Sequence, residues 1–328
     1  MADKLVRWQD ARVVGRAEVA EGIVRLDLEP ATAIAPRPGE HIDVAITLPD
    51  GRPDTRSYSI SGASPDGSRL AISVSTPAIS RGGSAYVRAL SEGDALRITE
   101  PLQDFPLRIG APSYVLLAGG VGITAIRGMA SLLQRIGAEY TLHYVGSSRA
   151  RMAYLAELES EHGERVIPHI TSEHGRMHVT DVLASVPADA ELYMCGPIRL
   201  MEAVKRLWDA SDRDPTSLRF ETFGNSGWFA PEAFEVEVPR LGVTVEVQPG
   251  ESMLEALERG GVDMMYDCRR GECGLCEVYI GELVGHVDHR DVFYSERQKA
   301  PNAKMCCCVS RVARGDGGRP GRVVIDVT

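Results

Sequence analysis

Three cysteines in the last quarter of the chain have a spacing that suits an iron–sulfur cluster. Cys268, Cys273 and Cys276 form a C-x4-C-x2-C pattern, and three consecutive cysteines, 306–308, follow about thirty residues later. This is the spacing of plant-type [2Fe–2S] sites, in which four thiolates hold the metal. The pattern therefore predicts an electron-carrying cluster, with its fourth ligand in the run of three cysteines.

The loop between these cysteines must wrap tightly around the metal. Gly271 and Gly274 give it the backbone freedom to do so, and N–H groups of such a loop can point at the sulfurs. Structural zinc is the alternative, but its sites usually contain two short cysteine pairs. If the later segment is a strand, Cys306 and Cys308 share a face and Cys307 points into the core. Both Cys306 and Cys308 then remain candidates for the fourth ligand.

The composition limits the class of protein, its compartment and its partners. The chain has 328 residues, of which 44% are hydrophobic and 25% charged, as in an ordinary globular protein of two or three domains. No leader pattern or membrane-spanning run is visible, so we expect a cytoplasmic protein without a membrane partner, whose thiols stay reduced. The net charge of −10 argues against nucleic acid as a partner. The paired histidines 174 and 178, and 286 and 289, are expected to be exposed loop residues rather than metal ligands.

A glycine-rich turn after a buried strand predicts a phosphate site. The segment SYVLLAGGVGITAIRGMASLLQR (113–135) has the pattern of a strand, a turn and a helix. Gly119, Gly120 and Gly122 permit close backbone approach, and the helix N-terminus offers N–H groups and the positive end of its dipole. The turn lacks the G-x-G-x-x-G fingerprint, so a plain strand-to-helix connection is an equal alternative for this segment alone.

Alternating strands and helices after this turn favour a nucleotide-binding sheet. Further strands are expected at 140–146, 165–170 and 191–197, with helices between and after them. This order predicts a doubly wound parallel sheet with ligands at the carboxyl ends of its strands. Gly119–Thr124 and Cys195–Pro197 fall at such ends and could flank one nucleotide. A nucleophilic Cys195 is the rival interpretation, but no basic partner lies near it in the sequence.

The first hundred residues predict an antiparallel β-barrel, because five alternating segments are separated by Gly, Pro or Asp turns. In RSYSIS, Arg56 and Tyr58 share one side of a strand. There the arginine could bind a phosphate and the aromatic ring could stack on a flat cofactor. Residues 82–84 precede a possible helix and form a second candidate anion site.

The C-terminal region predicts a β-grasp ferredoxin. A hairpin is expected from the alternating segments 234–238 and 243–247, a helix at 251–261 and a closing strand at 322–327. The predicted fold is thus multi-domain. It consists of an antiparallel β-barrel (1–108), a doubly wound α/β domain with a parallel sheet (109–224), a linker (225–233) and a plant-type [2Fe–2S] ferredoxin domain (234–328).

Together these features resemble the phthalate dioxygenase reductase family, which includes the vanillate demethylase reductases. The resemblance rests on R-x-Y-S and R-G-G-S in the barrel, then GGVGIT, CGP and the C-terminal cluster motif, and it covers nearly the whole chain. R-x-Y-S is shared with the wider ferredoxin–NADP reductase superfamily, whereas the domain order with R-G-G-S is more specific. The resemblance implies that the barrel binds FMN and the α/β domain binds NADH.

The resemblance also assigns binding residues by position. The matching flavin positions are Arg56, Ser57, Tyr58, Ser59, Gly82, Gly83 and Ser84, with Phe223 of FETFG expected near the flavin. The matching nicotinamide positions are Gly120, Gly122, Ile123, Thr124, Cys195, Gly196 and Pro197. DHRD and CVSR (308–311) match the ferredoxin domain, and the latter favours Cys308 as the fourth ligand beside Cys268, Cys273 and Cys276. Ser75 stands where relatives often carry a basic residue, so FAD stays open as an alternative to FMN.

The function implied is that of the reductase component of a Rieske-type aromatic-ring oxygenase or O-demethylase. NADH donates two electrons as hydride, a [2Fe–2S] cluster accepts one, and a flavin can mediate between them. Thr124 and Cys195 are expected to position the nicotinamide, and no residue is assigned as acid or base. Arg149 and Arg151 leave NADPH open as an alternative donor. The competing interpretation is a flavin and iron–sulfur redox sensor or binding module without steady turnover.

Overall fold

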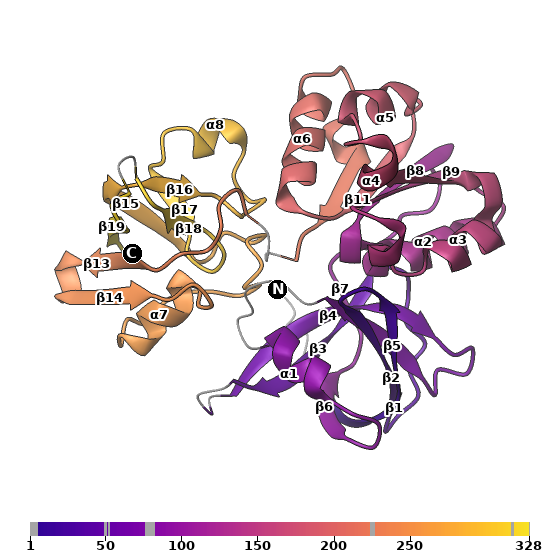
Figure 1. The fold of residues 1–328 in the computed structure, drawn as a ribbon, viewed down its shortest axis with the longest axis horizontal. Coiled ribbons are helices and arrows are strands. Elements are labelled where there is room, and N and C mark those ends of the chain that lie inside the picture. The colour runs from indigo at the N-terminus through magenta and orange to yellow at the C-terminus, as the bar shows by residue number, and fades with distance from the viewer. Residues whose placement is uncertain are drawn as a thin grey trace. The chain divides into compact units, whose positions relative to one another are not determined.

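The computed structural model describes residues 6–48, 51, 53–75, 83–223, 227–315 and 318–327. The chain divides into two compact units (Figure 1). The first comprises residues 1–196 and 203–221, and the second comprises residues 197–202 and 222–328. The first unit contains both the β-barrel and the parallel sheet that the sequence pattern predicts, and the second contains the ferredoxin fold.

The barrel is a seven-stranded antiparallel sheet in the order β4-β5-β2-β1-β6-β3-β7, closed by additional pairing of β4 with β3. Its elements are β1 (Trp8–Ala20), β2 (Ile23–Pro30), β3 (Glu40–Thr47), β4 (Pro53–Ala63), β5 (Leu70–Ser75), α1 (Gly83–Ala89), β6 (Ala95–Thr99) and β7 (Leu102–Gln103). Alternate residues of the strands, such as Val13, Leu26 and Leu28, are fully buried in one apolar core. The predicted barrel is confirmed, and closure leaves β4 paired on both sides.

The second sheet of this unit is parallel throughout, in the order β10-β9-β8-β11-β12. Its strands are β8 (Ser113–Gly119), β9 (Glu139–Gly146), β10 (Val166–Ile170), β11 (Glu191–Cys195) and β12 (Leu218–Glu221). The α-helices along this segment are α2 (Ile123–Arg135), α3 (Leu155–His162), α4 (Thr171–His174), α5 (Val179–Ser185) and α6 (Ile198–Asp209). The strand order reverses between β8 and β11, and such a switch point is where open α/β sheets bind ligands.

The ferredoxin unit contains a five-stranded sheet in the order β14-β13-β19-β15-β17 and a two-stranded sheet of β16 and β18. Its elements are β13 (Phe234–Val238), β14 (Val243–Val247), α7 (Met253–Arg259), β15 (Glu277–Val284), β16 (His286–Asp288), α8 (Glu296–Lys299), β17 (Lys304–Cys306), β18 (Arg311–Ala313) and β19 (Gly321–Asp326). The predicted hairpin is confirmed to the residue, with Phe234 opposite Val247 and Val238 opposite Val243.

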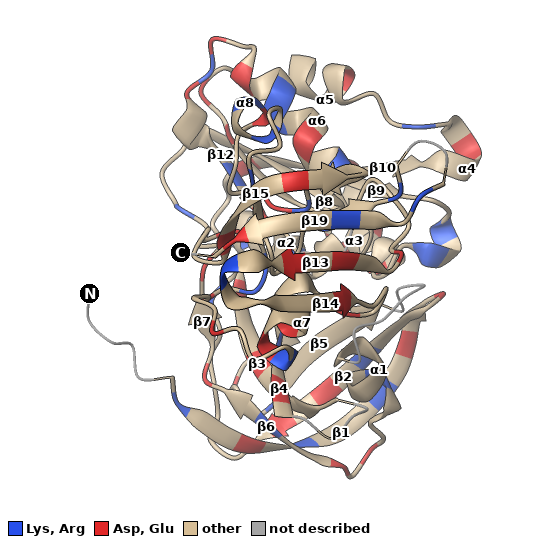
Figure 2. Cartoon of the chain, turned by 90° about the vertical axis from the view of Figure 1, so that its left-hand side faces the viewer, with Lys and Arg blue, Asp and Glu red and all other residues tan. Residues whose placement is uncertain are grey.

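Charged side chains lie on the solvent-exposed face of this five-stranded sheet. Figure 2 shows blue and red bands crossing β13, β19 and β15. They include Arg322 of β19, whose guanidinium lies 3.1 Å from Glu235 and 3.7 Å from Glu282 and also pairs with Glu237. Exposed pairs of this kind stabilise little individually, but opposite charges on adjacent strands favour one register over its neighbours.

Two expectations from the sequence need correction. Residues 306–308 do not form a strand: β17 ends at Cys306, and the N–H groups of Val309 and Ser310 bond back to the Cys306 carbonyl, which makes a turn. His289 is not an exposed loop residue but is only 8% exposed, with Nδ1 3.4 Å from the buried Asp291 carboxylate. Within the described part of the chain, no helix is long and apolar enough to cross a membrane.

Candidate functional site

The cluster loop, residues 268–276, wraps its backbone around a sulfur atom. The N–H groups of Arg270, Glu272 and Cys273 each lie 3.4 Å from Cys268 Sγ and donate to it. Donors of this kind stabilise the thiolate, which is the form that binds metal. They confirm the expectation that peptide N–H groups point at a ligand sulfur.

The two glycines of this loop hold conformations that other residues avoid. Gly271 has φ +76° and Gly274 has φ +77°, in the region that favours glycine. Both also lie against neighbouring side chains, because an added Cβ would come within 2.6 Å of Val309 and 2.3 Å of the Phe293 ring, respectively. A larger residue at either position would therefore displace the loop that carries the cysteines.

The thiols of the loop contact one another and the later cysteines in pairs. The Cys268 side chain interacts with Cys273 and Cys308, and Cys276 also interacts with Cys308. The hydrogen bond from Cys308, and further bonds from backbone N–H groups, lower the pKa of Cys268 to about 4. Hydrogen bonds from Cys306, Cys307 and Cys308 lower the pKa of Cys276 as well.

This arrangement fits a two-iron cluster. Plant-type clusters are held by four cysteine thiolates, two on each iron. The site therefore requires two pairs of thiols and not three thiols around one metal ion. Of the last three cysteines, Cys308 contacts both Cys268 and Cys276. The donor set is all sulfur and rich in N–H donors, as expected for an iron–sulfur site.

The DHRD segment (288–291) and the residues that follow it pack against the cluster loop. Val292 N–H donates to the Gly271 carbonyl at 3.0 Å, and the Asp291 carboxylate accepts the Tyr294 N–H at 3.0 Å. Asp288 forms a buried ion pair with Arg290 at 2.6 Å. Buried charges in proteins are normally paired in this way, and here the pairing fixes the segment against which Gly271 packs.

On the barrel, the predicted flavin residues of β4 meet the start of α1. Arg56 forms an ion pair with Asp54 at 2.5 Å and donates to the Thr55 carbonyl at 2.9 Å. Its side chain passes so close to Gly83 that a Cβ there would lie 2.5 Å from Arg56 Cγ. The sequence predicts these as two separate fragments, and the fold brings them together. Gly82 lies outside the described residues.

The next residues of β4 alternate as the strand prediction requires. The Ser57 hydroxyl donates to the Asp43 carboxylate at 2.5 Å, and Ser59 is buried opposite His41. Tyr58 is half-buried, like Arg56 two residues earlier, and burial raises the pKa of its hydroxyl. The neutral ring of Tyr58 and the cation of Arg56 thus share one side of the strand, which is the chemistry needed to hold a flat anionic cofactor.

The two nucleotide motifs meet at the switch point between β8 and β11. Gly122 ends the 3-10 turn Gly120–Gly122 that follows β8, and a Cβ on it would lie only 2.2 Å from the Cys195 carbonyl oxygen. Thr124 is buried in the first turn of α2, where its hydroxyl donates to the Val121 carbonyl at 2.9 Å. The structure therefore brings together GGVGIT and CGP, as the sequence predicts, and Cys195 itself is fully buried.

The barrel and the parallel sheet are joined within the first unit by buried contacts that sequence reasoning missed. The Tyr154 hydroxyl lies 2.5 Å from the Ser73 hydroxyl of β5. Tyr154 has φ 64°, an unfavourable value for a bulky residue, and Arg127 of α2 stacks over its ring at 4.0 Å. The alternating pattern of LAISVS in β5 carries no signal for such a long-range bond. Strain of this kind persists only where surrounding contacts hold it.

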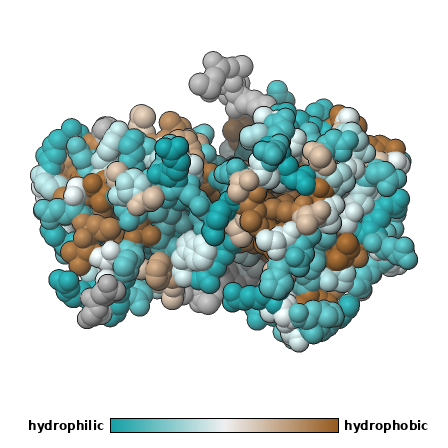
Figure 3. Space-filling model, turned by 90° about the horizontal axis from the view of Figure 1, so that it is seen from above, coloured by the Kyte–Doolittle hydropathy of each residue, from teal (hydrophilic) through white to brown (hydrophobic). Residues whose placement is uncertain are grey.

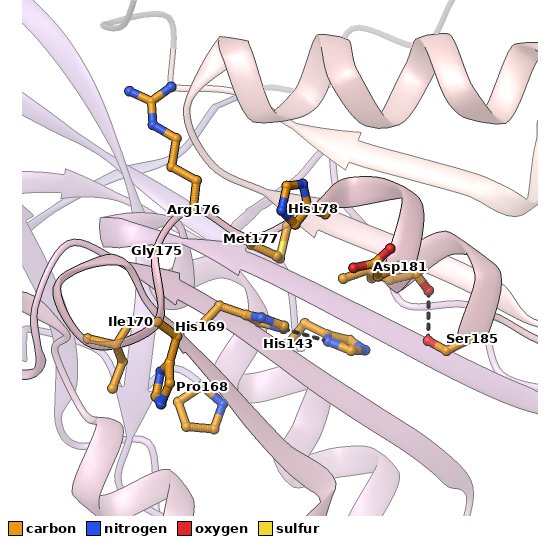
Figure 4. Close-up of a pocket in the computed structure, with 12 residues that line it drawn as sticks. His143, Pro168, His169, Ile170, Gly175, Arg176, Met177, His178, Asp181 and Ser185 are labelled. Carbon is orange, nitrogen blue, oxygen red and sulfur yellow. Dashed lines mark hydrogen bonds between the residues drawn. The ribbon is translucent and has the colours of Figure 1, made fainter.

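A pocket of about 310 Å³ lies in the first unit beside β9 and β10 (Figure 4). His143 Nδ1 lies 2.9 Å from His169 Nε2 within it, and the exposed His174 and His178 are also part of its lining. Burial, followed by the nearby His169, lowers the pKa of His143 to about 4. Among the described residues, no three His, Cys, Asp or Glu side chains are arranged around a single ion.

Fold and site together define a reductase that combines a flavin-type barrel, a nucleotide-binding sheet and a plant-type ferredoxin. Residues 236–313 match the 2Fe-2S iron-sulfur cluster binding domain family. The toluene-4-sulfonate monooxygenase system reductase subunit of Comamonas testosteroni is 35% identical over 94% of this chain and 96% of its own length. The chain belongs to the phthalate dioxygenase reductase family of oxygenase reductases.

Solved structures agree with this assignment. A phthalate dioxygenase reductase, described as a modular structure for electron transfer from pyridine nucleotides to [2Fe-2S], matches with 26% identity and a TM-score of 0.71 over 99% of both chains. An intact type IV self-sufficient cytochrome P450 monooxygenase matches with 30% identity and a TM-score of 0.65 over 97% of this chain and 41% of its own. The protein is accordingly a flavin and iron–sulfur oxidoreductase whose cofactors are FMN, NADH and a [2Fe–2S] cluster.

Proposed function

We propose that this chain is the NADH-dependent reductase component of a Rieske-type oxygenase or O-demethylase. Electrons are proposed to pass from NADH to FMN, then to the [2Fe–2S] cluster and then to the oxygenase. A flavin accepts a hydride and releases electrons singly, which is why it belongs between the other two carriers. The contacts of Cys308 with both Cys268 and Cys276 support the proposal, because they bring the later cysteine to the loop that carries the other three proposed ligands.

The site geometry supports the proposed binding roles. Arg56 and the Gly83 backbone are proposed to hold the FMN phosphate or ring, with Tyr58, Ser57, Ser59 and Ser84 around it. Phe223, half-buried after β12, is proposed to lie near the flavin. The turn at Gly120–Thr124 and the Cys195–Pro197 segment are proposed to enclose the nicotinamide nucleotide, because Gly122 and Cys195 meet there. These residues orient the cofactors, and none is required as an acid or base.

Charge pairing favours NADH over NADPH. Arg149, a candidate for binding a 2′-phosphate, lies 3.1 Å from Glu159 and 3.3 Å from Glu173. Two carboxylates around this arginine offset the positive charge that a 2′-phosphate would need. We therefore expect a higher kcat/KM for NADH, measured against NADPH with ferricyanide as acceptor.

The oxygenase is proposed to dock beside the cluster loop. Leu275 in this loop and Phe293, which lies against Gly274, are 48% and 44% exposed, and Met265, three residues before the loop, is 70% exposed. Figure 3 shows apolar surface set among polar residues on the face viewed. Exposed apolar groups rimmed by polar ones are typical of protein contact sites. Electron transfer downhill from a plant-type cluster to a Rieske centre is consistent with their usual potentials.

The chain is also similar to 41% of a self-sufficient cytochrome P450 monooxygenase. A haem oxygenase is therefore the second candidate partner. The two are separated by mixing the NADH-reduced protein anaerobically with a purified Rieske oxygenase or with a P450 haem domain. Reduction of the Rieske centre at a rate matching turnover supports the proposal, and reduction of the haem alone contradicts the partner class.

The electron route is tested with a full-length variant. Cys273→Ala should abolish the cluster and reduction of the oxygenase while leaving NADH oxidation with ferricyanide within about twofold of wild type. Cys195 and the flavin residues are untouched, so the front of the route stays intact. Oxygenase reduction at the wild-type rate by a cluster-free variant would show that the cluster is not on the route. Steady NADH turnover also excludes a redox sensor without catalysis.

A further inference from the structure

The second unit includes a short stretch from outside the ferredoxin part of the sequence. Residues 197–202, which are Pro197 and the first residues of α6, group with residues 222–328. Pro197 directly follows Cys195 and Gly196 in the chain and is the last residue of the proposed nicotinamide segment. The contacts that hold this stretch within the second unit therefore fix one end of that segment.

Glu202 is at the centre of these contacts. One oxygen of its carboxylate lies 2.9 Å from Lys299 Nζ of α8, and the other accepts a hydrogen bond from Trp228 Nε1 at 2.7 Å. The side chains of Glu202 and Lys299 are only 13% and 11% exposed. Such a pair is a strong restraint, because removal of either partner leaves a charge that is both poorly solvated and unpaired.

Arg199, one turn before Glu202, binds the backbone of the same tryptophan. Its guanidinium donates to the Gly227 carbonyl at 3.3 Å and to the Trp228 carbonyl, and it lies over the Trp228 ring at 5.2 Å. The Trp228 N–H in turn donates to the buried Asp288 carboxylate at 2.8 Å. The start of α6 is thus held through both the side chain and the main chain of Trp228.

Lys299 connects the same carboxylate of Glu202 to the residues that pack against the cluster loop. Its ammonium donates to the Asp291 carbonyl at 2.6 Å and lies 3.8 Å from the fully buried Asp291 carboxylate. Asp291 packs directly on the loop, since a Cβ on Gly271 would lie 2.9 Å from its Cα. One lysine therefore joins the start of α6 to the segment that supports the proposed cluster.

We propose that Lys299 and Trp228 are positioning residues for the nucleotide site. Through Glu202 they hold the start of α6, and with it Pro197, in the geometry that receives the nicotinamide. The inference rests on the proposed function, because it takes Cys195–Pro197 as a nicotinamide-binding segment. A segment that is already held in its bound geometry loses less conformational entropy when its ligand binds. Loss of the restraint should therefore weaken NADH binding, although neither Lys299 nor Trp228 belongs to GGVGIT or CGP.

The test is steady-state NADH oxidation by full-length variants, with ferricyanide as acceptor. Lys299→Met should raise the KM for NADH roughly 3- to 10-fold, the cost of ordering a released segment at each binding event, and leave kcat within about twofold. Trp228→Phe, which removes only the Nε1 donor to Glu202, should raise the KM by a smaller factor. Lys304→Met is the matched control, because Lys304 lies 2.8 Å from Glu277 elsewhere in the same unit, and its KM should equal that of wild type.

A double-mutant cycle shows whether the pair itself is responsible. Glu202→Gln should raise the KM for NADH as Lys299→Met does. The double variant Glu202→Gln/Lys299→Met should be no worse than the more impaired single variant, because each substitution already breaks the same contact. A purely structural role of Lys299 in the ferredoxin unit would lower cluster retention and leave the KM for NADH unchanged.

Two results would overturn the inference. One is a wild-type KM for NADH in Lys299→Met, or in Trp228→Phe where Lys299→Met does not yield folded protein. The other is a double variant whose KM rises by the full product of the two single effects. A wild-type protein that does not oxidise NADH, or that lacks a [2Fe–2S] signal, would instead refute the proposed function, so the two failures are distinguishable.

Discussion

Gly122→Ala should separate the two halves of the proposed nucleotide site. The new Cβ would lie 2.2 Å from the Cys195 carbonyl oxygen, 2.5 Å from its carbon and 3.0 Å from Gly196 N. All three atoms belong to the backbone, so no side chain can rotate away, and the turn must shift away from β11. Overpacking of this kind costs about 1–3 kcal/mol. If that cost falls on the nucleotide complex, the KM for NADH rises roughly 5- to 150-fold.

Steady-state NADH oxidation with ferricyanide measures this effect, and thermal unfolding measures the accompanying change in stability. Gly137→Ala is the matched control, because Gly137 has φ +67° with no atom within 4 Å of an added Cβ. It should cost about 1 kcal/mol through backbone strain and leave the KM for NADH unchanged. A KM for Gly122→Ala within twofold of wild type would show that the contact with Cys195 does not shape the nucleotide site.

Three further outcomes are expected. Arg56→Ala should weaken FMN binding roughly 10- to 150-fold, because a charged hydrogen-bond donor worth about 1.5–3 kcal/mol is lost. A fluorescence titration measures the affinity, and the exposed Arg69→Ala variant is the control that should bind FMN normally. Equal FMN affinities of the two variants would show that the flavin site is misplaced. His143 has its pKa lowered from 6.5 to about 4 by burial and then by His169, so the unfolded chain binds the extra proton first and stability falls as pH drops below 6.5. Urea unfolding should show that the free energy of unfolding falls by about 2 kcal/mol between pH 7.5 and pH 5. This fall should be smaller in His143→Gln. An unchanged pH dependence in that variant would show that His143 is not the group responsible. Tyr154→Phe should destabilise the first unit by about 1 kcal/mol, and a double-mutant cycle with Ser73→Ala should show coupling, whereas strict additivity would mean that the hydroxyl pair contributes nothing.

Elements with regular alternation are predictable from the sequence. β13 and β14 match their predicted limits because apolar residues alternate through FEVEV and VTVEV without interruption. The long first strand β1 was not predicted, since register shifts between Val13 and Gly15 and between Glu18 and Ala20 break its alternation. β12 has only four residues and also went unpredicted. The S-x-x-E capping box of Ser252 and Glu255, which marks the start of α7, was present in the sequence as a signal.

Site residues were predictable where the ligand chemistry is local. The cluster loop carries its spacing, its glycines and its N–H donors within nine residues, so the sequence is enough to predict it. The contact of Arg56 with Gly83 and that of Gly122 with Cys195 depend on strand pairing and helix packing across distant segments. The turn at Cys306 depends on hydrogen bonds to its carbonyl that compete with strand extension, which local propensity does not reveal.

The joint between the barrel and the parallel sheet has a consequence for the speed of the proposed hydride transfer. Helix α2, which starts at the nucleotide turn, packs on β4, which carries Arg56, and the buried bond of Tyr154 to Ser73 ties the same two subdomains. The relative orientation of the two proposed cofactor sites is therefore established when the chain folds. Reactants held in a prepared geometry avoid an entropic cost at each turnover. The fixed orientation of the two subdomains, and not a closing movement between them, would thus align the nicotinamide with the flavin. The rate of flavin reduction should consequently depend little on solvent viscosity.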